Sequence, residues 1–553
     1  MKFAGIVIGI VALSAVLYLG RLGDRGVISE ELRWAEVARE MDLTGNYFWP
    51  TIDGKLYYDK PLGSYWLVLA AAKIPGEVNE LAARLPAAIS GLISLVIVML
   101  LARRLYDERT AIWAGVILAT SYGFVFYSRR ATADLETLTG VLLAYMLYAW
   151  NPHQPRFWKI VLLWVIMACT SQTKGLLGFA LPGLLLLVHH FVSEIKTTTR
   201  TGWRKYLSFQ CINPWFWNRA TFLTFPLGLA IFLTPFMISS MQNPQSDGLA
   251  LLYRENLKRF FSPHNHTGPI YLYVGVIFVI FAPWSLFLIP GLWQIHRRSD
   301  SDSRQAESDL LTKCYFWTIF IFFTLSASRR SYYLLPILPA AALMSARFFA
   351  TPEPLLSPAV RIMKRIGILL FSIVVLLAGA VLLPWRDYVK APYNQLPELP
   401  MQALFGIGWA LSVVVGIFLL FKRRTIMVWL TGVLYLGLGY LFLFALPQFE
   451  EERGRKTLAQ EVRKTIEDEP DRLVLYSSRD IVFDLKLDHP IPDADVPEEL
   501  EELLKNRQPK WLIIPRKKLS DLKYPYRILA EEKSHEWETA VQHGLKLLLL
   551  ELQ

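Results

Sequence analysis

The sequence has little cysteine and few charged residues. Only 3 of its 553 residues are cysteine, and Cys169, Cys211 and Cys314 fall in or beside apolar runs or on loops predicted to be cytoplasmic. This argues against a disulfide framework and leaves no thiol metal motif. Charged residues make up 19% of the chain, against 53% that are hydrophobic. The chain has no internal repeat of fixed period and, apart from the short Ser299–Arg304 segment, no low-complexity tract.

What the chain has instead is a series of long apolar runs. The mean hydropathy is +0.32, and apolar residues run together for roughly 17–25 positions, the length that crosses a hydrocarbon core. A soluble protein of this size would carry amphipathic segments in several domains. The pattern predicts a polytopic α-helical membrane protein with about thirteen transmembrane helices. Examples of the runs are Ala4–Gly20, Gly175–Val192, Ile366–Leu383 and Ala403–Phe421.

Basic residues in the short loops indicate the orientation. With the N-terminus in the cytoplasm, nearly every even-numbered loop is basic, as the positive-inside rule requires. The net charge of +11 then needs no nucleic-acid partner. The first run is expected to be a retained span, because no small-x-small cleavage site follows it. An odd number of spans places the C-terminus on the outer side. The basic loops contain Arg103/Arg104, Arg156/Lys159, Lys196–Lys205, Arg297/Arg298, Arg361–Arg365 and Lys422–Arg424.

Two segments are expected to lie outside the membrane on the outer side. The first is a loop of residues 21–82 with helix and turn signals. The second is a small C-terminal α/β domain over residues 449–553, which leaves residues 1–448 as the transmembrane domain. Within the C-terminal domain the periodicity predicts helices at Thr457–Ile466 and Glu498–Leu504, and strands at Leu473–Tyr476 and Trp511–Ile514.

Several outer loops, which should be poor in basic residues, carry them at the membrane edge. Long basic side chains often extend from an apolar surface to the interface, and this explains any single one of them. It does not explain why the set lies on the disfavoured side. A cluster of cations at the outer surface suits an anionic lipid headgroup. The set comprises Arg33, Lys60, Arg129/Arg130, Lys174, Arg254/Lys258/Arg259 and Arg329/Arg330.

Acidic residues accompany these cations. In a helix over the first outer loop, Glu36, Arg39 and Glu40 suit ordinary ion pairs at helical spacing. Glu30 and Glu31 fit that explanation less well, because they stand at the helix start near the first span. Asp134 lies at the outer start of the fourth span. Carboxylates beside spans are costly unless paired, so two of them on different outer loops predict an acid/base or metal constellation.

These residues also carry a resemblance. The segment Glu30-Glu31-x-Arg33-x-Ala35-Glu36 resembles the Asp-Glu-x-Arg-Tyr-Ala-Glu motif of the lipid A aminoarabinose transferases, which are related to the protein O-mannosyltransferases. In this order the motifs are specific, and they extend over essentially the whole chain. The further matches are Trp49-Pro50, Gly54, Tyr57, Asp59-Lys60-Pro61-Leu62, Tyr65-Trp66, Arg84-Leu85-Pro86, Arg130 with Asp134, Thr173-Lys174-Gly175, Asn256-x-x-Arg259-Phe260 and Tyr333-Leu334-Leu335-Pro336-x-x-Pro339.

The resemblance implies a thirteen-span GT-C glycosyltransferase in the bacterial inner membrane, with its active site facing the periplasm. It implies an inverting transfer of a sugar, such as 4-amino-4-deoxy-L-arabinose, from undecaprenyl phosphate to lipid A, a lipopolysaccharide modification. The enzyme is expected to be a monomer. Catalytic carboxylates would be Glu30, Asp134 and Glu31. Substrate-binding residues would be Lys60, Arg33, Arg259, Arg329, Arg330, Tyr333, Tyr57 and Lys174.

The chain departs from the family pattern at a few positions. Glu30 replaces the leading aspartate, which leaves Glu30 and Glu31 as alternatives for the family acid. Arg329 or Arg330 stands where lysine is usual, and Pro61-Leu62 replaces a double proline. No cofactor is required for the reaction. A family divalent-metal site would use Asp59 with a loop histidine, for which His264 and His266 are the candidates.

Other activities remain open at the level of sequence. The acceptor is lipid A or, alternatively, a core or O-antigen sugar, a cell-wall glycan or a protein Ser/Thr hydroxyl. A secondary transporter is the alternative outside the transferases. It would show discontinuous helices, ionisable residues near mid-span and often a repeat, whereas here the charges lie at loop edges.

Overall fold

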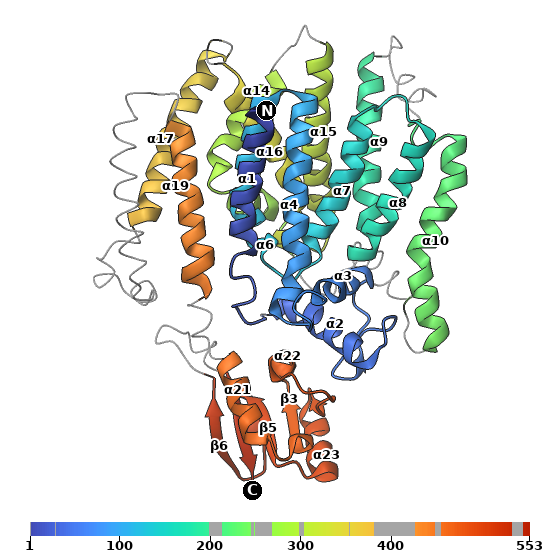
Figure 1. The fold of residues 1–553 in the computed structure, drawn as a ribbon, viewed down its shortest axis with the longest axis vertical. Coiled ribbons are helices and arrows are strands. Elements are labelled where there is room, and N and C mark those ends of the chain that lie inside the picture. Colours follow the sequence, from blue (N-terminus) through green and yellow to red (C-terminus); the bar gives the residue numbers. More distant parts are fainter. Residues whose placement is uncertain are drawn as a thin grey trace.

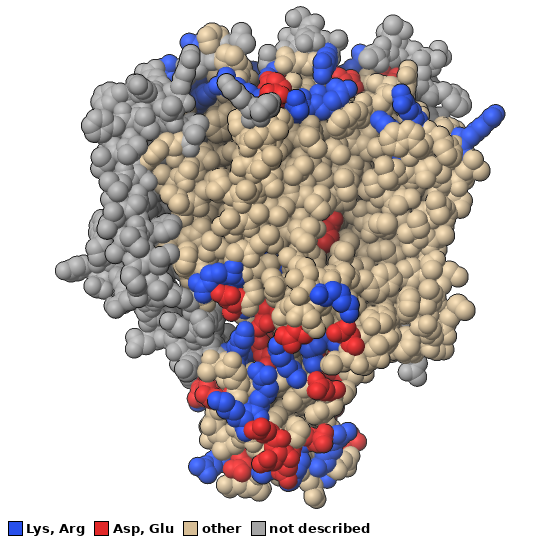
Figure 2. All heavy atoms as spheres, in the orientation of Figure 1, with Lys and Arg blue, Asp and Glu red and all other residues tan. Residues whose placement is uncertain are grey.

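The computed structural model describes residues 2–27, 29–197, 213–244, 268–297, 303–380 (without 353 and 355), 426–447, 455–532 and 546–553, together with Gly248. A bundle of long helices makes up most of it, and a small α/β domain sits at one end of the bundle (Figure 1). On the face shown in Figure 2, charged side chains gather at the two ends of the molecule, and a broad band with almost no charged side chains separates them. A band of this kind suits the hydrocarbon layer of a membrane.

The described helices support the membrane prediction. Five are long and apolar enough to cross a membrane, or up to seven if each bent pair counts as one span, and three shorter apolar helices accompany them. The total of about thirteen stays a prediction, because the expected span at 403–421 lies outside the described residues. The bundle comprises α1 (Lys2–Leu19), α4 (Glu80–Leu105), α5 (Glu108–Ala119), α6 (Tyr122–Ser128), α7 (Asp134–Ala149), α8 (Phe157–Lys174), α9 (Leu177–Thr197), α10 (Arg219–Gln242), α13 (Leu272–Ile280), α14 (Leu288–Arg297), α15 (Ser303–Leu325), α16 (Leu338–Ala350), α17 (Pro358–Ala380) and α19 (Ile426–Tyr440).

Small residues let the central helices approach closely. All thirteen residues of α16 are buried, three of them the consecutive alanines 340–342. At the α7–α8 contact, a Cβ on Gly140 would lie 1.9 Å from Thr170 Oγ1, so no larger residue fits there. Close approach of this kind is how helices gain dispersion contacts in a membrane, where the surrounding lipid is as apolar as the side chains. It fixes the relative positions of α7 and α8, whose ends carry site residues.

The first outer loop forms short elements beside the bundle. They are η1 (Ser29–Glu31), α2 (Leu32–Thr44), β1 (Thr51–Ile52), β2 (Lys55–Leu56) and α3 (Gly63–Ala72). The predicted pair within α2 is present, since Arg39 donates to both Glu36 oxygens at 2.6 and 2.9 Å. Glu40 lies beside this pair and interacts electrostatically with both members. It accepts hydrogen bonds from Thr51 and from the Asp53 backbone, and so holds the hairpin to α2.

The C-terminal domain has the predicted elements. They are α21 (Arg455–Ile466), β3 (Leu473–Tyr476), α22 (Val482–Leu485), β4 (Asp493–Ala494), α23 (Pro497–Arg507), β5 (Trp511–Pro515), β6 (Tyr526–Glu531) and β7 (Leu547–Leu552). The sheet order is β4-β3-β5-β7-β6, parallel from β4 to β5 and antiparallel beyond. The proposed boundary at 448/449 falls outside the described residues.

Polar contacts join this domain to the first outer loop. Arg39 Nη1 donates to Leu487 O at 2.8 Å, and the Ile491 N–H donates to Asp53 Oδ1 at 2.5 Å. Lys55 forms an ion pair with Asp493, whose side chain is almost fully buried. The domain thus contacts the segment that leads into the predicted site.

Candidate active site

The predicted site residues that the structure describes gather at the end of the bundle that faces the C-terminal domain (Figure 1). α7 begins at Asp134 and the neighbouring α8 ends at Lys174, so an antiparallel helix pair brings these residues together. Gly175 ends α8 with a positive φ of 74°, a conformation that costs glycine least. η7 (Ser331–Ile337) supplies Tyr332 and Tyr333 from a third part of the chain.

Asp134 and Lys174 form an ion pair in this region. The Lys174 ammonium donates to Asp134 Oδ1, and both side chains are largely buried. The same ammonium lies 4.9 Å from the ring centroid of Tyr332 and 5.2 Å from that of Tyr333. Two aromatic faces and a carboxylate therefore surround one cation, which compensates for its partial loss of water.

A second ion pair joins Arg330 to Glu30. It connects the segment before η7 with η1, and about a quarter of each side chain is exposed. The Arg330 guanidinium also lies 5.6 Å from the Tyr332 ring centroid. Glu30 is therefore held by a cation and remains accessible to a small molecule at the surface.

A third group centres on Asp59. Its Oδ2 contacts both Arg33 Nη1 at 2.9 Å and Lys60 Nζ at 3.1 Å, so two cations converge on one carboxylate oxygen. Burial lowers the pKa of Arg33, but Asp59 and the tyrosines Tyr57, Tyr65 and Tyr332 outweigh this, and the pKa is raised from its ordinary value. Arg33 thus stays charged and is oriented by Asp59.

Tyr332 links the three groups, although the sequence drew attention to its neighbour Tyr333. Its hydroxyl interacts electrostatically with Asp134, Arg330 and Arg33. The family motif contains Tyr333, and nothing in the sequence indicated that Tyr332, one residue earlier, would meet the charged groups.

Glu136 is a second residue that the sequence did not single out. It interacts electrostatically with Asp134 and Lys174, and its Oε2 finds no hydrogen-bond partner within the described part of the chain.

Glu31 and Arg329 are held by contacts within the protein, and a structural role suits them better than it suits Glu30 and Arg330. The Glu31 carboxylate is fully buried, where it accepts two hydrogen bonds from Arg84 and one from the Ala131 N–H. Arg329 donates to the backbone oxygens of Gly268 and Thr324 at 2.5 and 3.1 Å. Among the alternatives left open by sequence, this geometry favours Glu30 over Glu31 and Arg330 over Arg329 for contact with a substrate.

Three predicted residues lie outside the described part of the chain: Arg259, His264 and His266. The third candidate metal ligand, Asp59, already faces two cations through one oxygen. That arrangement fits an anion-binding site better than a metal site, because a bound divalent ion would repel both cations. Metal dependence stays a prediction.

Known proteins share the fold and parts of the sequence. The family described as dolichyl-phosphate-mannose-protein mannosyltransferase matches residues 59–217. An undecaprenyl phosphate-alpha-4-amino-4-deoxy-L-arabinose arabinosyl transferase of Pseudomonas fluorescens is 24% identical over 408 residues, which cover 72% of this chain and 65% of that protein. The chain therefore spans slightly less than two thirds of that relative.

Solved structures extend the comparison to the whole chain. The ArnT structure from Cupriavidus metallidurans bound to undecaprenyl phosphate has a TM-score of 0.74 at 19% identity, covering 99% of this chain and 98% of that one. The archaeal oligosaccharyltransferase AglB from Archaeoglobus fulgidus has a TM-score of 0.52 at 10% identity, covering 94% and 70%. The resemblance indicated by the motifs is thus confirmed at the level of the fold: the chain has the GT-C fold of these solved membrane proteins, and it is similar in sequence to polyprenyl-phosphate-sugar transferases.

Proposed function

We propose that the protein transfers a sugar from a polyprenyl-phosphate carrier to an acceptor at the periplasmic face of the bacterial inner membrane. The convergence of Arg33 and Lys60 on Asp59, close to Tyr332, is the observation that carries the proposal. The relatives support it, since their names specify an undecaprenyl-phosphate sugar and one was solved with undecaprenyl phosphate bound.

The cations suit the departing group of such a reaction. When the sugar leaves, negative charge develops on the lipid phosphate, and preorganised cations stabilise that charge. Arg33 is held by Asp59 before any substrate arrives, so little reorganisation is needed. Lys60, 14% exposed, presents its ammonium beside Arg33. We assign Arg33 and Lys60 to the phosphate, with Arg259 as a further candidate from the sequence.

The carboxylates suit the acceptor side. If the acceptor is a hydroxyl, Glu30 or Asp134 accepts its proton as the glycosidic bond forms. If the acceptor is a lipid A phosphate, no base is required, and the same carboxylates orient the acceptor or an amino group of the sugar. Each carboxylate is paired with a cation, Glu30 with Arg330 and Asp134 with Lys174.

The preferred donor sugar is 4-amino-4-deoxy-L-arabinose, which the names of the relatives specify. The preferred acceptor is lipid A, as the family resemblance of the motifs implies. A core or O-antigen sugar, a cell-wall glycan and a protein Ser/Thr hydroxyl remain alternatives, and the match to the mannosyltransferase family favours the last of these. A secondary transporter has less support, because the ion pairs of the site lie at one end of the bundle.

Mass spectrometry of lipid A from cells with and without the gene tests the preferred acceptor. The expected result is a sugar-sized mass increment that needs both the gene and an intact Lys60. An unchanged lipid A profile, together with transfer from a labelled polyprenyl-phosphate sugar to glycan or protein, would replace lipid A by that acceptor. If the folded protein consumed no polyprenyl-phosphate sugar, the proposal would be overturned.

A further inference from the structure

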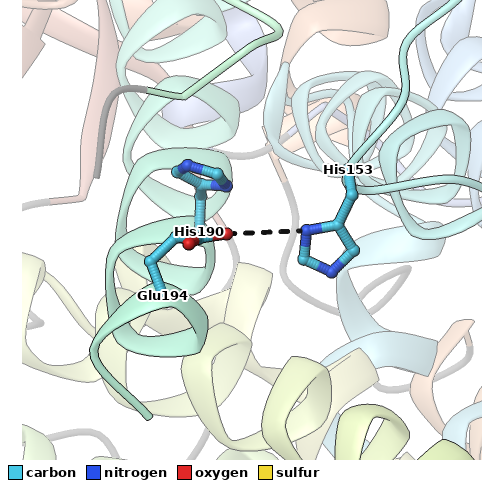
Figure 3. Close-up of side chains that lie close together, drawn as sticks. All are labelled: His153, His190 and Glu194. Carbon is cyan, nitrogen blue, oxygen red and sulfur yellow. Dashed lines mark ion pairs between the residues drawn. The ribbon is translucent and has the colours of Figure 1, made fainter. Parts of the chain in front are cut away.

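A second cluster of chemically active side chains lies far from the candidate active site. His153 is in the loop between α7 and α8, and His190 and Glu194 are on α9 near its last turns (Figure 3). This is the end of the bundle opposite the C-terminal domain (Figure 1). Neither the motifs nor the proposed transfer reaction uses these residues.

The three side chains are close enough to share a ligand. One donor atom from each lies within 4.8 Å of the others, and His153 Nδ1 is 4.0 Å from Glu194 Oε1. His190 and Glu194 are four residues apart on α9, so they project from the same face of the helix. Figure 3 shows the His153 ring pointing across the gap toward the Glu194 carboxylate.

The cluster combines a buried and an exposed part. His190 is only 3% exposed, whereas the His153 side chain is 45% and the Glu194 side chain 23% exposed. A buried imidazole on a helix gives a fixed ligand position. The two more exposed side chains have the freedom to close on an ion that enters from the surface.

Further groups surround the three. Glu307 on α15 has its Oε1 3.2 Å from His153 Nε2 and 3.7 Å from His189 Nε2. His189 Nδ1 lies 2.8 Å from the Tyr148 hydroxyl. A carboxylate on the far nitrogen of a ligating histidine is the usual support of a metal-bound imidazole, because it fixes the ring and its tautomer.

The donor set selects the kind of ion. Two imidazole nitrogens and one carboxylate oxygen suit Zn²⁺ and similar transition metals, whereas Ca²⁺ and Mg²⁺ prefer oxygen ligands. Tetrahedral bonds of about 2.0–2.2 Å place two ligand atoms about 3.3–3.6 Å apart. The ligand atoms, which lie within 4.8 Å of one another, therefore have to approach by up to about 1.5 Å, which side-chain rotation of His153 and Glu194 can supply.

We propose that His153, His190 and Glu194 bind one Zn²⁺-like transition metal ion at the end of the bundle opposite the active site. The ion would join the α7–α8 loop to α9, with Glu307 orienting His153 from α15. With three protein ligands, the fourth position is left to water. The site is structural and independent of the transfer reaction.

Metal titration of the full-length protein in detergent tests this proposal. The chelator-treated protein is titrated with Zn²⁺ by calorimetry and with Co²⁺ by visible absorption. One equivalent should bind, and His190→Ala and Glu194→Gln should each weaken binding at least about a hundred-fold. His153→Ala, at an exposed loop position where folding is least at risk, should weaken it as well. The temperature of unfolding should rise with Zn²⁺ in the wild type and much less in the three ligand variants.

Two matched controls separate this site from others. His489→Ala removes a histidine in the C-terminal domain that faces Asp471, and binding should be unchanged. The double variant His264→Ala/His266→Ala removes the histidines of the sequence-predicted outer site, and binding should again be unchanged. Absence of saturable binding to folded wild type, full binding by His190→Ala and Glu194→Gln, or loss only in the double variant would overturn the proposal. None of these outcomes depends on measured sugar transfer.

Discussion

Glu31 and Arg84 form a buried ion pair in which Arg84 Nε and Nη2 donate to the two carboxylate oxygens at 2.9 Å each. Both side chains are at most 1% exposed. Burial opposes ionisation of Glu31, but the charge and hydrogen bonds of Arg84 outweigh it and lower the pKa of Glu31 to about 2. Arg84 also donates to the backbone oxygens of Leu22, Arg25 and Gly26, so it fixes the loop before η1 to α4.

Replacing Arg84 by alanine should therefore destabilise the protein strongly. The change leaves a buried carboxylate and several carbonyl oxygens without their partner, and losses of about 3–5 kcal/mol are usual for such a broken pair. The control is Arg103→Ala, which removes the half-exposed pair with Glu108 and should cost at most about 1 kcal/mol. Unfolding of both variants in detergent measures the difference. Equal losses would contradict a structural role for Glu31–Arg84.

Lys60→Ala should slow sugar transfer at subsaturating donor by about ten- to a hundred-fold, with little loss of folded protein. A charge-assisted contact to phosphate contributes about 1.5–3 kcal/mol, and the variant keeps Arg33 in place. Lys73→Ala is the matched control, because Lys73 is exposed just after α3 and away from the site. Turnover like that of the wild type in Lys60→Ala would remove Lys60 from the phosphate-binding set.

Glu30→Gln and Asp134→Asn test the acid/base assignment. If the acceptor is a hydroxyl, one of the two carboxylates acts as the base. The variant that removes this carboxylate should lower turnover per folded molecule by at least about a hundred-fold. Asp24→Asn, at an exposed carboxylate paired with Arg21, should leave turnover unchanged. Melting curves establish that the variants are folded. Near-normal transfer by either variant would remove that residue from the catalytic set.

The stability of the folded protein should fall as the pH rises, because the pKa of Asp53 is raised in the folded state. Burial raises the pKa of Asp53, the Ile491 N–H partly opposes this, and the charges of Asp493, Glu40 and Glu36 raise it further, from 3.8 to about 7. Between these values the folded protein binds a proton that the unfolded chain has lost. Stability therefore falls as the pH increases from about 4 to about 7.

Thermal unfolding and limited proteolysis of the C-terminal domain between about pH 5 and about pH 8 measure this dependence. The range includes the raised pKa of Asp53, about 7. Asp53→Asn should flatten the profile, because the amide does not titrate. Asp468→Asn changes an exposed acid of the C-terminal domain and should retain the wild-type slope of stability against pH. A profile of Asp53→Asn that follows the wild type would show that another group governs the pH dependence of stability.

Labelling of single cysteines tests the orientation. In a background without Cys169, Cys211 and Cys314, Ser520→Cys in the C-terminal domain should react with a membrane-impermeant maleimide in intact spheroplasts. Arg109→Cys, at the opposite end of the bundle, should react only after permeabilisation. Both positions are exposed, so access depends on the side of the membrane. The reverse pattern would invert the topology.

Local patterns in the sequence predicted much of the fold. Apolar runs predicted α1 and α9 to within several residues and the part of α17 from Ile366 onward, and periodicity predicted α21, α23, β3 and β5. The Glu36–Arg39 pair followed from helical spacing alone. These features depend on neighbours a few positions apart, and the same spacing that makes them visible in the sequence also forms them in the chain.

The partners of the charged residues were decided by tertiary structure. Arg33 pairs with Asp59 and not with an acid of its own helix, Glu40 holds a hairpin, and Glu31 is buried against Arg84. The meeting of His153 with His190 and Glu194 likewise needs the packed helices.

The sequence by itself determined that cations and carboxylates accumulate at one membrane edge, because charge is excluded from the hydrocarbon layer whatever the packing. The packing of α7, α8, η1 and η7 decided which cation meets which carboxylate. It also placed Tyr332 between them. Side-chain contacts between segments far apart in sequence depend on helix packing, and helix packing depends on small residues such as Gly140 whose role no local pattern reveals.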